Sequence, residues 1–192
     1  YLNPFHDSHI FTHNTWIMFS LKICSGAYDL ELSKIYVAYG ILSYCPKKCL
    51  ESWTCEFSKN YPKLINVTHI NNDITLAAAY IGYEPVSRTV KSLGEEVQML
   101  KIGYKILQYK WSPSLGVVNA NHVGFHQDYH LNQKKIFERL DLITKSYPVN
   151  KIVITGHSLG AALASINALY IAISGINYPV EVYNFGSPRY GN

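Results

Sequence analysis

Charged side chains are scarce in this sequence. Asp, Glu, Lys and Arg make up 16% of the 192 residues, the net charge is only +4, and no run of Lys or Arg is longer than two residues. No basic stripe interleaved with aromatic residues is present, so we expect no nucleic-acid partner. Long hydrophobic runs are also missing, because no stretch reaches the 18 consecutive apolar residues of a membrane-spanning helix. The remaining composition, 48% hydrophobic, is that of one globular domain with a sizeable core.

Cysteine is limited to four residues, Cys24, Cys45, Cys49 and Cys55. No second CxxC-type pair and no suitably spaced histidine lie near them, so we expect no metal site. The last three fall within eleven residues, which favours a local disulfide, Cys45 to Cys55 or Cys49 to Cys55, over the alternative of free thiols. A glycosylation sequon at Asn66–Thr68 also points to a secreted or lumenal protein.

The N-terminal stretch has mixed polarity. Residues 16–27 (W-I-M-F-S-L-K-I-C-S-G-A) are similar to the core of a signal peptide, but no basic leader precedes them and Lys22 interrupts the apolar run. We therefore expect residues 1–26 to be a leader or irregular segment and residues 27–192 to form the domain.

The most informative stretch is Lys151–Ala164, K-I-V-I-T-G-H-S-L-G-A-A-L-A. A short β-branched run, a G-x-S-x-G motif and a helix-forming run follow one another without room for a loop. This order is typical of a nucleophile elbow, in which two glycines permit a turn too tight for side chains and the serine between them reacts. Ser158 is therefore a candidate nucleophile at a helix N-terminus, where free N–H groups favour developing negative charge. A glycine-rich turn with an incidental serine is the alternative.

Other segments alternate between helix and strand patterns, which predicts a parallel or mixed sheet covered by helices. From Leu93 to Trp111 the apolar residues recur every three or four positions, which predicts an amphipathic helix that either packs on the core or covers an active site. The expected elements are a helix over 27–44, strands over 64–70 and 73–83, a polar loop over 119–130, a helix over 131–147 with Ile136, Leu140 and Ile143 inward, and a buried strand over 180–185.

Five motifs in this order resemble the class 3, fungal-lipase-like triacylglycerol lipases: Y-C-P-K-K-C-L-E-S-W-T-C, A-Y-I-G-Y-E-P, H-V-G-F-H-Q-D-Y, I-V-I-T-G-H-S-L-G-A-A-L-A and Y-N-F-G-S-P-R-Y-G-N. The resemblance implies an α/β-hydrolase fold with a central, mostly parallel sheet flanked by helices. It also implies hydrolysis of lipid esters without a cofactor, and secretion. By matched position Ser158 is the nucleophile and the Leu159 backbone N–H is one oxyanion donor. The segments His122–Phe125 and Gly186–Arg189 match parts of the family that are mainly structural.

Two features depart from the family pattern. The family carries F-R-G-[ST] on a strand just after the segment matching Tyr80–Pro85, and this chain has only Arg88-Thr89 as a possible remnant, to which we assign no role. The chain also runs only 34 residues past Ser158, to Asn192, without an Asp or a His. The family places its triad Asp and His after the serine.

Without a base the Ser158 hydroxyl is a poor nucleophile, so we expect this chain to be inactive or nearly so, with the C-terminal part of the fold missing. His157 neighbours the serine but should point away from it. A replacement triad from His122, His126, His130 and Asp128 is a minor alternative. The rival functions are a non-catalytic lipid-binding relative of the lipases and another α/β-hydrolase such as a thioesterase. The oligomeric state cannot be read from the sequence.

Overall fold

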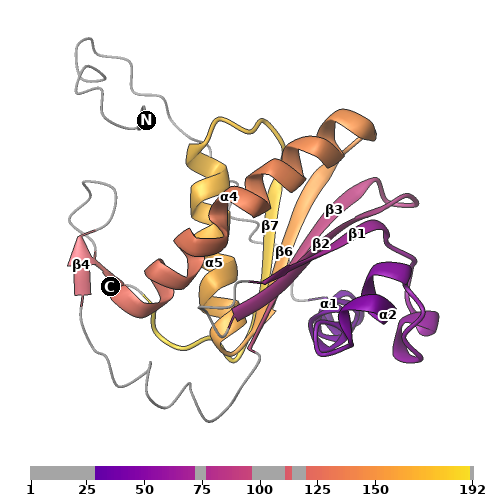
Figure 1. The fold of residues 1–192 in the computed structure, drawn as a ribbon, viewed down its shortest axis with the longest axis horizontal. Coiled ribbons are helices and arrows are strands. Elements are labelled where there is room, and N and C mark those ends of the chain that lie inside the picture. The colour runs from indigo at the N-terminus through magenta and orange to yellow at the C-terminus, as the bar shows by residue number, and fades with distance from the viewer. Residues whose placement is uncertain (1–28, 72–76, 97–110, 114–119, 191–192) are drawn as a thin grey trace.

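The computed structural model of the protein describes residues 29–71, 77–96, 111–113 and 120–190, and its centre is a five-stranded mixed sheet (Figure 1). The strands lie in the order β1-β2-β3-β6-β7. The first three pair antiparallel, and β3, β6 and β7 pair parallel. The strands are β1 (Ile65–Asn71), β2 (Ala77–Glu84), β3 (Thr89–Glu96), β6 (Lys151–His157) and β7 (Val180–Phe185).

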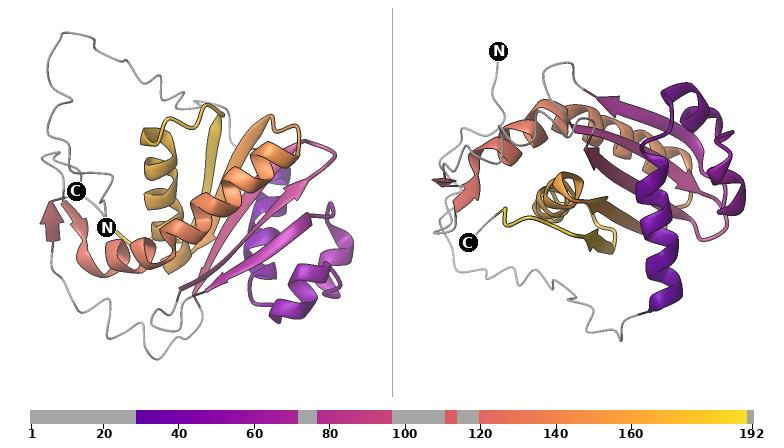
Figure 2. Two further views of the ribbon diagram at one scale, coloured as in Figure 1. Left: turned by 45° about the horizontal axis from the view of Figure 1, so that its top comes forward. Right: turned by 90° about the horizontal axis from the view of Figure 1, so that it is seen from below.

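Helices cover both faces of this sheet. In Figures 1 and 2, α4 and α5 lie on one face, and α1 and α2 lie on the other. The strands β4 and β5 form a separate two-stranded sheet. These remaining elements are α1 (Leu30–Leu42), α2 (Lys47–Ser52), the 3-10 helix η1 (Phe57–Asn60), β4 (Trp111–Pro113), β5 (Ala120–His122), α4 (Val123–Ser146) and α5 (Leu159–Ile173).

Strand β6 shows why both faces are covered. Its side chains alternate, as the period of two in a strand requires. Ile152 and Ile154 join the core beneath α4 and α5, and Val153 joins the core beneath α1 and α2. All three side chains are at most 1% exposed. The apolar run Ile152–Ile154 is therefore buried on both sides of the sheet, as the run I-V-I in the sequence predicts.

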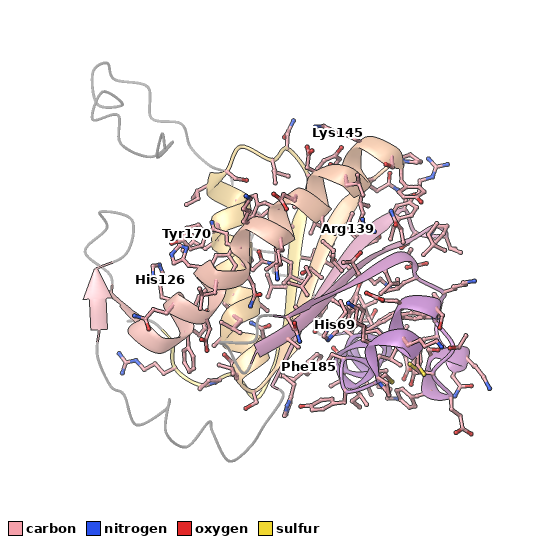
Figure 3. The ribbon with its side chains drawn as sticks, viewed as in Figure 1. His69, His126, Arg139, Lys145, Tyr170 and Phe185 are labelled. Carbon is pink, nitrogen blue, oxygen red and sulfur yellow. The ribbon has the colours of Figure 1, made fainter. Side chains whose placement is uncertain are left out.

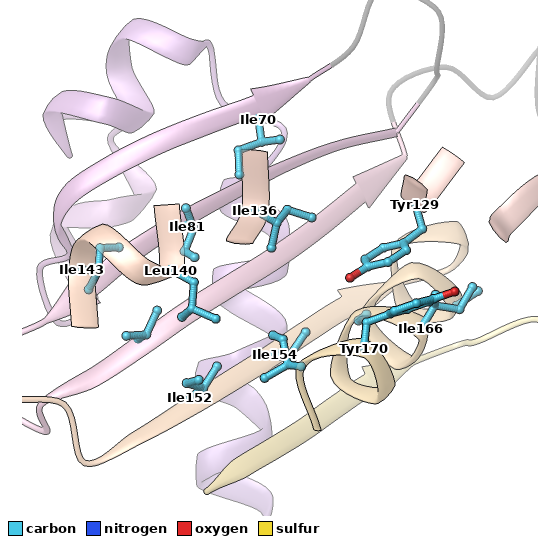
Figure 4. Close-up of a cluster of buried hydrophobic side chains, with 14 of the residues drawn as sticks. Ile70, Ile81, Tyr129, Ile136, Leu140, Ile143, Ile152, Ile154, Ile166 and Tyr170 are labelled. Carbon is cyan, nitrogen blue, oxygen red and sulfur yellow. The ribbon is translucent and has the colours of Figure 1, made fainter. Parts of the chain in front are cut away.

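Helix α4 confirms the inward positions Ile136, Leu140 and Ile143, which are buried against β6 and its neighbours (Figure 4). Their spacing of four and three residues places them on one face of the helix. Tyr129 and Phe125 extend the same buried stripe by about two and three turns toward the N-terminus.

The expected polar loop over residues 119–130 is therefore wrong. Residues 120–122 form β5, and α4 begins at Val123. The stripe was hidden because the polar residues His126, Gln127 and Asp128 fill the positions between Phe125 and Tyr129. A buried face needs only one residue in three or four to be apolar.

The helix expected from Leu93 to Trp111 is also wrong at both ends, because residues 89–96 are strand β3 and Trp111 begins strand β4. Strand β3 pairs with β2 on one side and β6 on the other, so it lies inside the sheet. Hydrogen bonding to two neighbours overrides the local helical period of the apolar residues. The remaining part of that expected helix, residues 97–110, lies outside the described residues, as do residues 1–28 and residues 73–76 of the strand expected over 73–83.

The helix expected over 27–44 is confirmed as α1 and begins with a side-chain cap. The Leu32 N–H donates to Asp29 Oδ1 at 3.0 Å. Replacing Asp29 by alanine leaves that N–H without its partner, so we expect a loss of about 1 kcal/mol of unfolding free energy. Urea unfolding followed by circular dichroism measures this loss. Asp29→Asn, which keeps an acceptor oxygen, should lose much less; an equal loss in both variants would contradict the capping role.

The three described cysteines are free thiols in the structure, so the expected disulfide is not confirmed. Burial, followed by a hydrogen bond with Cys45, raises the pKa of the Cys55 thiol to about 12. Within the part of the chain that the structure describes, no helix has both the length and the apolar composition needed to cross a membrane.

Candidate active site

The junction of β6 and α5 is a tight turn centred on Ser158. Strand β6 ends at His157 and α5 begins at Leu159, so Ser158 alone makes the connection. Its backbone angles are φ 53° and ψ −122°. A positive φ is uncommon for a residue with a side chain, and a conformation of this kind is held only where the surrounding structure enforces it. The strand, sharp turn and helix predicted from the sequence are confirmed.

Gly156 makes this turn possible. A Cβ atom at Gly156 would lie 2.2 Å from the carbonyl oxygen of Gly160 and 2.7 Å from the backbone nitrogen of Ala161. These contacts are with backbone atoms of the first helical turn, which cannot rotate away as a side chain can. The first glycine of the motif therefore lets β6 and α5 approach each other closely enough to leave Ser158 at the apex.

Backbone hydrogen bonds fix Ser158 on both sides. Its N–H donates to the carbonyl oxygen of Phe185, at 3.0 Å, and its own carbonyl oxygen accepts from the Ala161 N–H, also at 3.0 Å. The Ser158 side chain makes no capping hydrogen bond to the helix, and the residue is partly exposed. The hydroxyl therefore stands at the surface with its backbone held in place.

The first turn of α5 offers N–H groups beside this hydroxyl. Backbone N–H groups at the start of a helix, here those of Leu159 and Gly160, have no partner within the helix. They also carry the positive end of the helix dipole. The geometry can therefore stabilise negative charge next to Ser158, which is the chemistry expected for the Leu159 N–H.

The neighbouring strands end beside the turn. Gly94 of β3 pairs with Gly156, and Phe185 of β7 pairs with His157. Strand β3 thus occupies the position where the resemblance places the strand that carries the second oxyanion donor. The sequence analysis did not predict this strand. The signal was a β-branched and apolar start, Thr89-Val90, in a segment whose later residues suggested a helix.

Arg88-Thr89 lies at the other end of β3, because Thr89 pairs with Lys151 at the start of β6. Five residues of strand separate it from Gly94, a length of about 17 Å. The structure therefore gives no oxyanion role to this remnant. Beside the serine, the exposed His157 lies against the turn after β7, where a Cβ atom at Gly186 would be 3.7 Å from its Nε2.

Two of the histidines considered for a replacement triad, His126 and His130, lie on α4 and face the far end of α5, and the side chain of the third, His122, lies outside the described residues. His126 and His130 contact Tyr170, twelve residues after Ser158 (Figure 3). At a rise of 1.5 Å per residue this is about 18 Å from the turn, beyond the reach of a proton transfer. Asp128 is buried within the core face of α4. The structure therefore does not bring these residues to Ser158.

Among the residues that the structure describes, no three His, Cys, Asp or Glu side chains are grouped as metal ligands. The turn itself presents a strained serine beside the backbone N–H groups of the first turn of α5. Its chemistry would be nucleophilic attack with stabilisation of an oxyanion.

Comparison with known families identifies this arrangement. The family model for lipases of class 3 matches residues 86–192, which are more than half of the chain. The chain belongs to the class 3 lipase family. A secreted mono- and diacylglycerol lipase from Fusarium solani is 37% identical over 71 residues, which are 37% of this chain and 21% of the relative. A rice phospholipase A1-II (Oryza sativa subsp. indica) is 63% identical over 43 residues, or 21% of this chain and 11% of the relative.

Solved lipase structures share the fold. A lipase from Rhizopus microsporus var. chinensis superposes with a TM-score of 0.75 at 21% identity, over 84% of this class 3 lipase chain and 58% of its own. A triacylglycerol lipase whose catalytic centre is described as a serine protease triad gives a TM-score of 0.73 at 21% identity, over 88% and 65%. The α/β-hydrolase fold is thereby confirmed, with a mixed sheet among the described strands. The chain spans less than two thirds of each of these relatives.

Proposed function

We propose that Ser158 is the nucleophile of a carboxylic ester hydrolase that acts on lipid substrates of the triacylglycerol kind. The observation that carries this proposal is the strained turn that presents the Ser158 hydroxyl beside the free N–H groups of α5. A residue held in such a backbone conformation costs about 1 to 3 kcal/mol of folding free energy, and residues strained in this way cluster at functional sites.

The reaction follows from these groups. The Ser158 Oγ forms a bond to the ester carbonyl carbon while its proton passes to a base. The carbonyl oxygen becomes an oxyanion that accepts from the Leu159 N–H. Collapse of this intermediate breaks the bond to the alcohol, which leaves as the acyl-enzyme forms, and water then releases the fatty acid.

The base for this reaction is not found after Ser158, because residues 159–192 contain neither Asp nor His. The proposal therefore includes a weak activity for the 192-residue chain itself. Removal of a base leaves only the part of the rate that comes from binding and from the oxyanion site.

The proposed substrate class rests on relatives that this chain covers only in part. Those compared are an acylglycerol lipase, a phospholipase and triacylglycerol-type lipases. We accordingly propose a lipid ester as substrate, reached at a lipid–water interface. The Fusarium relative is described as secreted, which supports the same location for this protein. No cofactor is needed by the proposed chemistry.

A serine-directed fluorophosphonate tests the proposal. We expect slow covalent labelling of the chain at Ser158, accelerated by added imidazole as an external base, and at least a tenfold lower extent in Ser158→Ala. Ser165→Ala is the matched control, because the Ser165 hydroxyl donates to the Ala161 carbonyl within the same helix, at 3.1 Å. This variant should be labelled like the wild type. Intact-mass spectrometry measures the extent.

The same experiment separates the rival function. A lipid-binding protein without catalysis would bind phosphatidylcholine vesicles and would show no labelling at Ser158, with or without imidazole. Labelling that persists unchanged in Ser158→Ala would also contradict the proposal, since the reactive group would then lie elsewhere.

A further inference from the structure

Three side chains from α4 and α5 converge at one point away from Ser158. His126 Nε2 lies 2.8 Å from the Tyr170 hydroxyl oxygen and 3.0 Å from His130 Nε2, and His130 Nε2 lies 3.2 Å from the same hydroxyl oxygen. Three polar atoms thus form a triangle whose sides all fall within hydrogen-bond distance. Figure 3 shows His126 and Tyr170 facing each other from the two helices.

The fold positions these groups before any ligand arrives. His126 and His130 are four residues apart, so they lie on the same face of α4, one turn above the other. Tyr170 is fixed by stacking on Tyr129, with ring centroids 4.9 Å apart (Figure 4). The Tyr129 hydroxyl in turn donates to Asn167 Oδ1, at 3.2 Å. Ring stacking and a hydrogen bond therefore fix the position of Tyr170 within the triangle.

A second hydrogen bond sets the tautomer of His130. Its Nδ1 lies 2.7 Å from Gln133 Oε1, which can only accept, so Nδ1 carries the proton. In the neutral ring, Nε2 then presents a lone pair to the triangle. A histidine that binds a metal through one ring nitrogen usually donates the N–H of its other ring nitrogen to an acceptor in this way.

We propose that His126, His130 and Tyr170 form a binding site for a divalent transition-metal ion, with the two Nε2 atoms as ligands and the Tyr170 oxygen at a third position. This site is separate from the proposed active site and does not depend on the function of Ser158.

The distances fit such an ion. Two ligand atoms about 2.1 Å from zinc are about 3.0 to 3.4 Å apart at angles between 90° and tetrahedral. The triangle needs only small movements to meet this geometry. Imidazole nitrogen suits Zn²⁺, Cu²⁺ and Ni²⁺, whereas Mg²⁺ and Ca²⁺ require oxygen ligands. Water completes the coordination, since His130 is exposed and His126 is partly so.

Zinc titration by isothermal calorimetry at pH 7.5 tests the site in the whole chain. We expect one site in the wild type, and at least about a tenfold weaker affinity in His126→Gln and in His130→Gln, since even an outer-shell change costs that much. Magnesium should not bind. The unfolding temperature should rise with zinc in the wild type only, because the ion links two helices in the native state.

Two controls separate the triangle from four of the other six histidines. His69→Gln changes a histidine on β1, and a triple variant of His6, His9 and His13 removes those near the N-terminus. Both should bind zinc like the wild type. Circular dichroism verifies that the His130→Gln variant is folded, as expected for an exposed side chain.

Zinc binding that is unchanged in folded His130→Gln, or lost in the triple N-terminal variant, would overturn the proposal. No zinc-dependent rise in unfolding temperature would overturn it as well. The three side chains would then be a hydrogen-bonded contact between α4 and α5 and nothing more.

Discussion

Gly156→Ala should unfold the protein or remove more than about 3 kcal/mol of its unfolding free energy. Overpacking of a core ordinarily costs about 1 to 3 kcal/mol, because side chains can move aside. At Gly156 the new methyl group would meet the Gly160 carbonyl oxygen at 2.2 Å, so strand and helix must separate. Urea unfolding, or the recovery of soluble protein, measures the effect.

Gly40 provides the matched control. It lies within α1, and a Cβ atom there would have no atom within 4 Å. Glycine in a helix interior is about 1 kcal/mol less favourable than alanine, so Gly40→Ala should stabilise the protein. Opposite signs for the two substitutions are the expected result. A mild effect at Gly156, comparable to that of an ordinary surface change, would contradict the close approach of β6 and α5.

Lys91→Met should remove about 3 to 5 kcal/mol of unfolding free energy, because it leaves a buried carboxylate without its partner. Lys91 Nζ lies 3.0 Å from Glu84 Oε2, and both side chains are at most 7% exposed. The ammonium also lies over the Tyr39 ring, 4.0 Å from its centroid. The Ser87 hydroxyl donates to Glu84 Oε2 at 2.6 Å, which completes the group.

The double variant with Glu84→Gln is the control for this pair. It removes both charges, so much of the lost stability should return. A double-mutant cycle measures the coupling between the two residues. If the double variant is as unstable as Lys91→Met, the loss comes from packing of the lysine stem rather than from the unpaired charge.

The pair also predicts an acid dependence. Burial alone would raise the pKa of Glu84, but hydrogen bonds from Ser87 and Lys91 and the charge of Lys91 outweigh it and lower the pKa. A lowered pKa in the folded state gives stability that is present above the unfolded value of about 4.3 and is lost as the pH falls toward the folded value. In Lys91→Met the hydrogen bonds from Ser87 remain but the hydrogen bond and the charge of Lys91 are lost, so the lowering of the Glu84 pKa, and with it this acid dependence, should become smaller.

The sequence alone predicted the elements whose patterns are local. The run Lys151–Ala164 carries its own strand, turn and helix signals, and the structure confirms all three. The inward positions of α4 follow from the spacing of its apolar residues. The strand over 180–185 is present as β7, but the expectation that it is buried is wrong, because its residues are only partly buried and Val182 is 41% exposed. The choice of Ser158 as candidate nucleophile also came from this local order, and its role stays a prediction.

Other features depend on partners that are distant in sequence. Strand β3 forms because β2 and β6 both pair with it, and the apolar periodicity of its own sequence does not predict a strand. The first turns of α4 were hidden because polar residues separate Phe125 from Tyr129. The triangle of His126, His130 and Tyr170 joins residues 40 and 44 positions apart, so only the packing of α4 on α5 could reveal it.

The most direct test of the central claim, that the turn makes Ser158 a nucleophile, is to trap an acyl-enzyme. The folded chain is incubated with p-nitrophenyl butyrate, quenched in acid and analysed by peptide mass spectrometry. We predict a butyryl group on Ser158, which persists because residues 159–192 supply no base to activate the deacylating water. Butyrylation absent from Ser158, or found there equally in the urea-unfolded chain, would contradict the account.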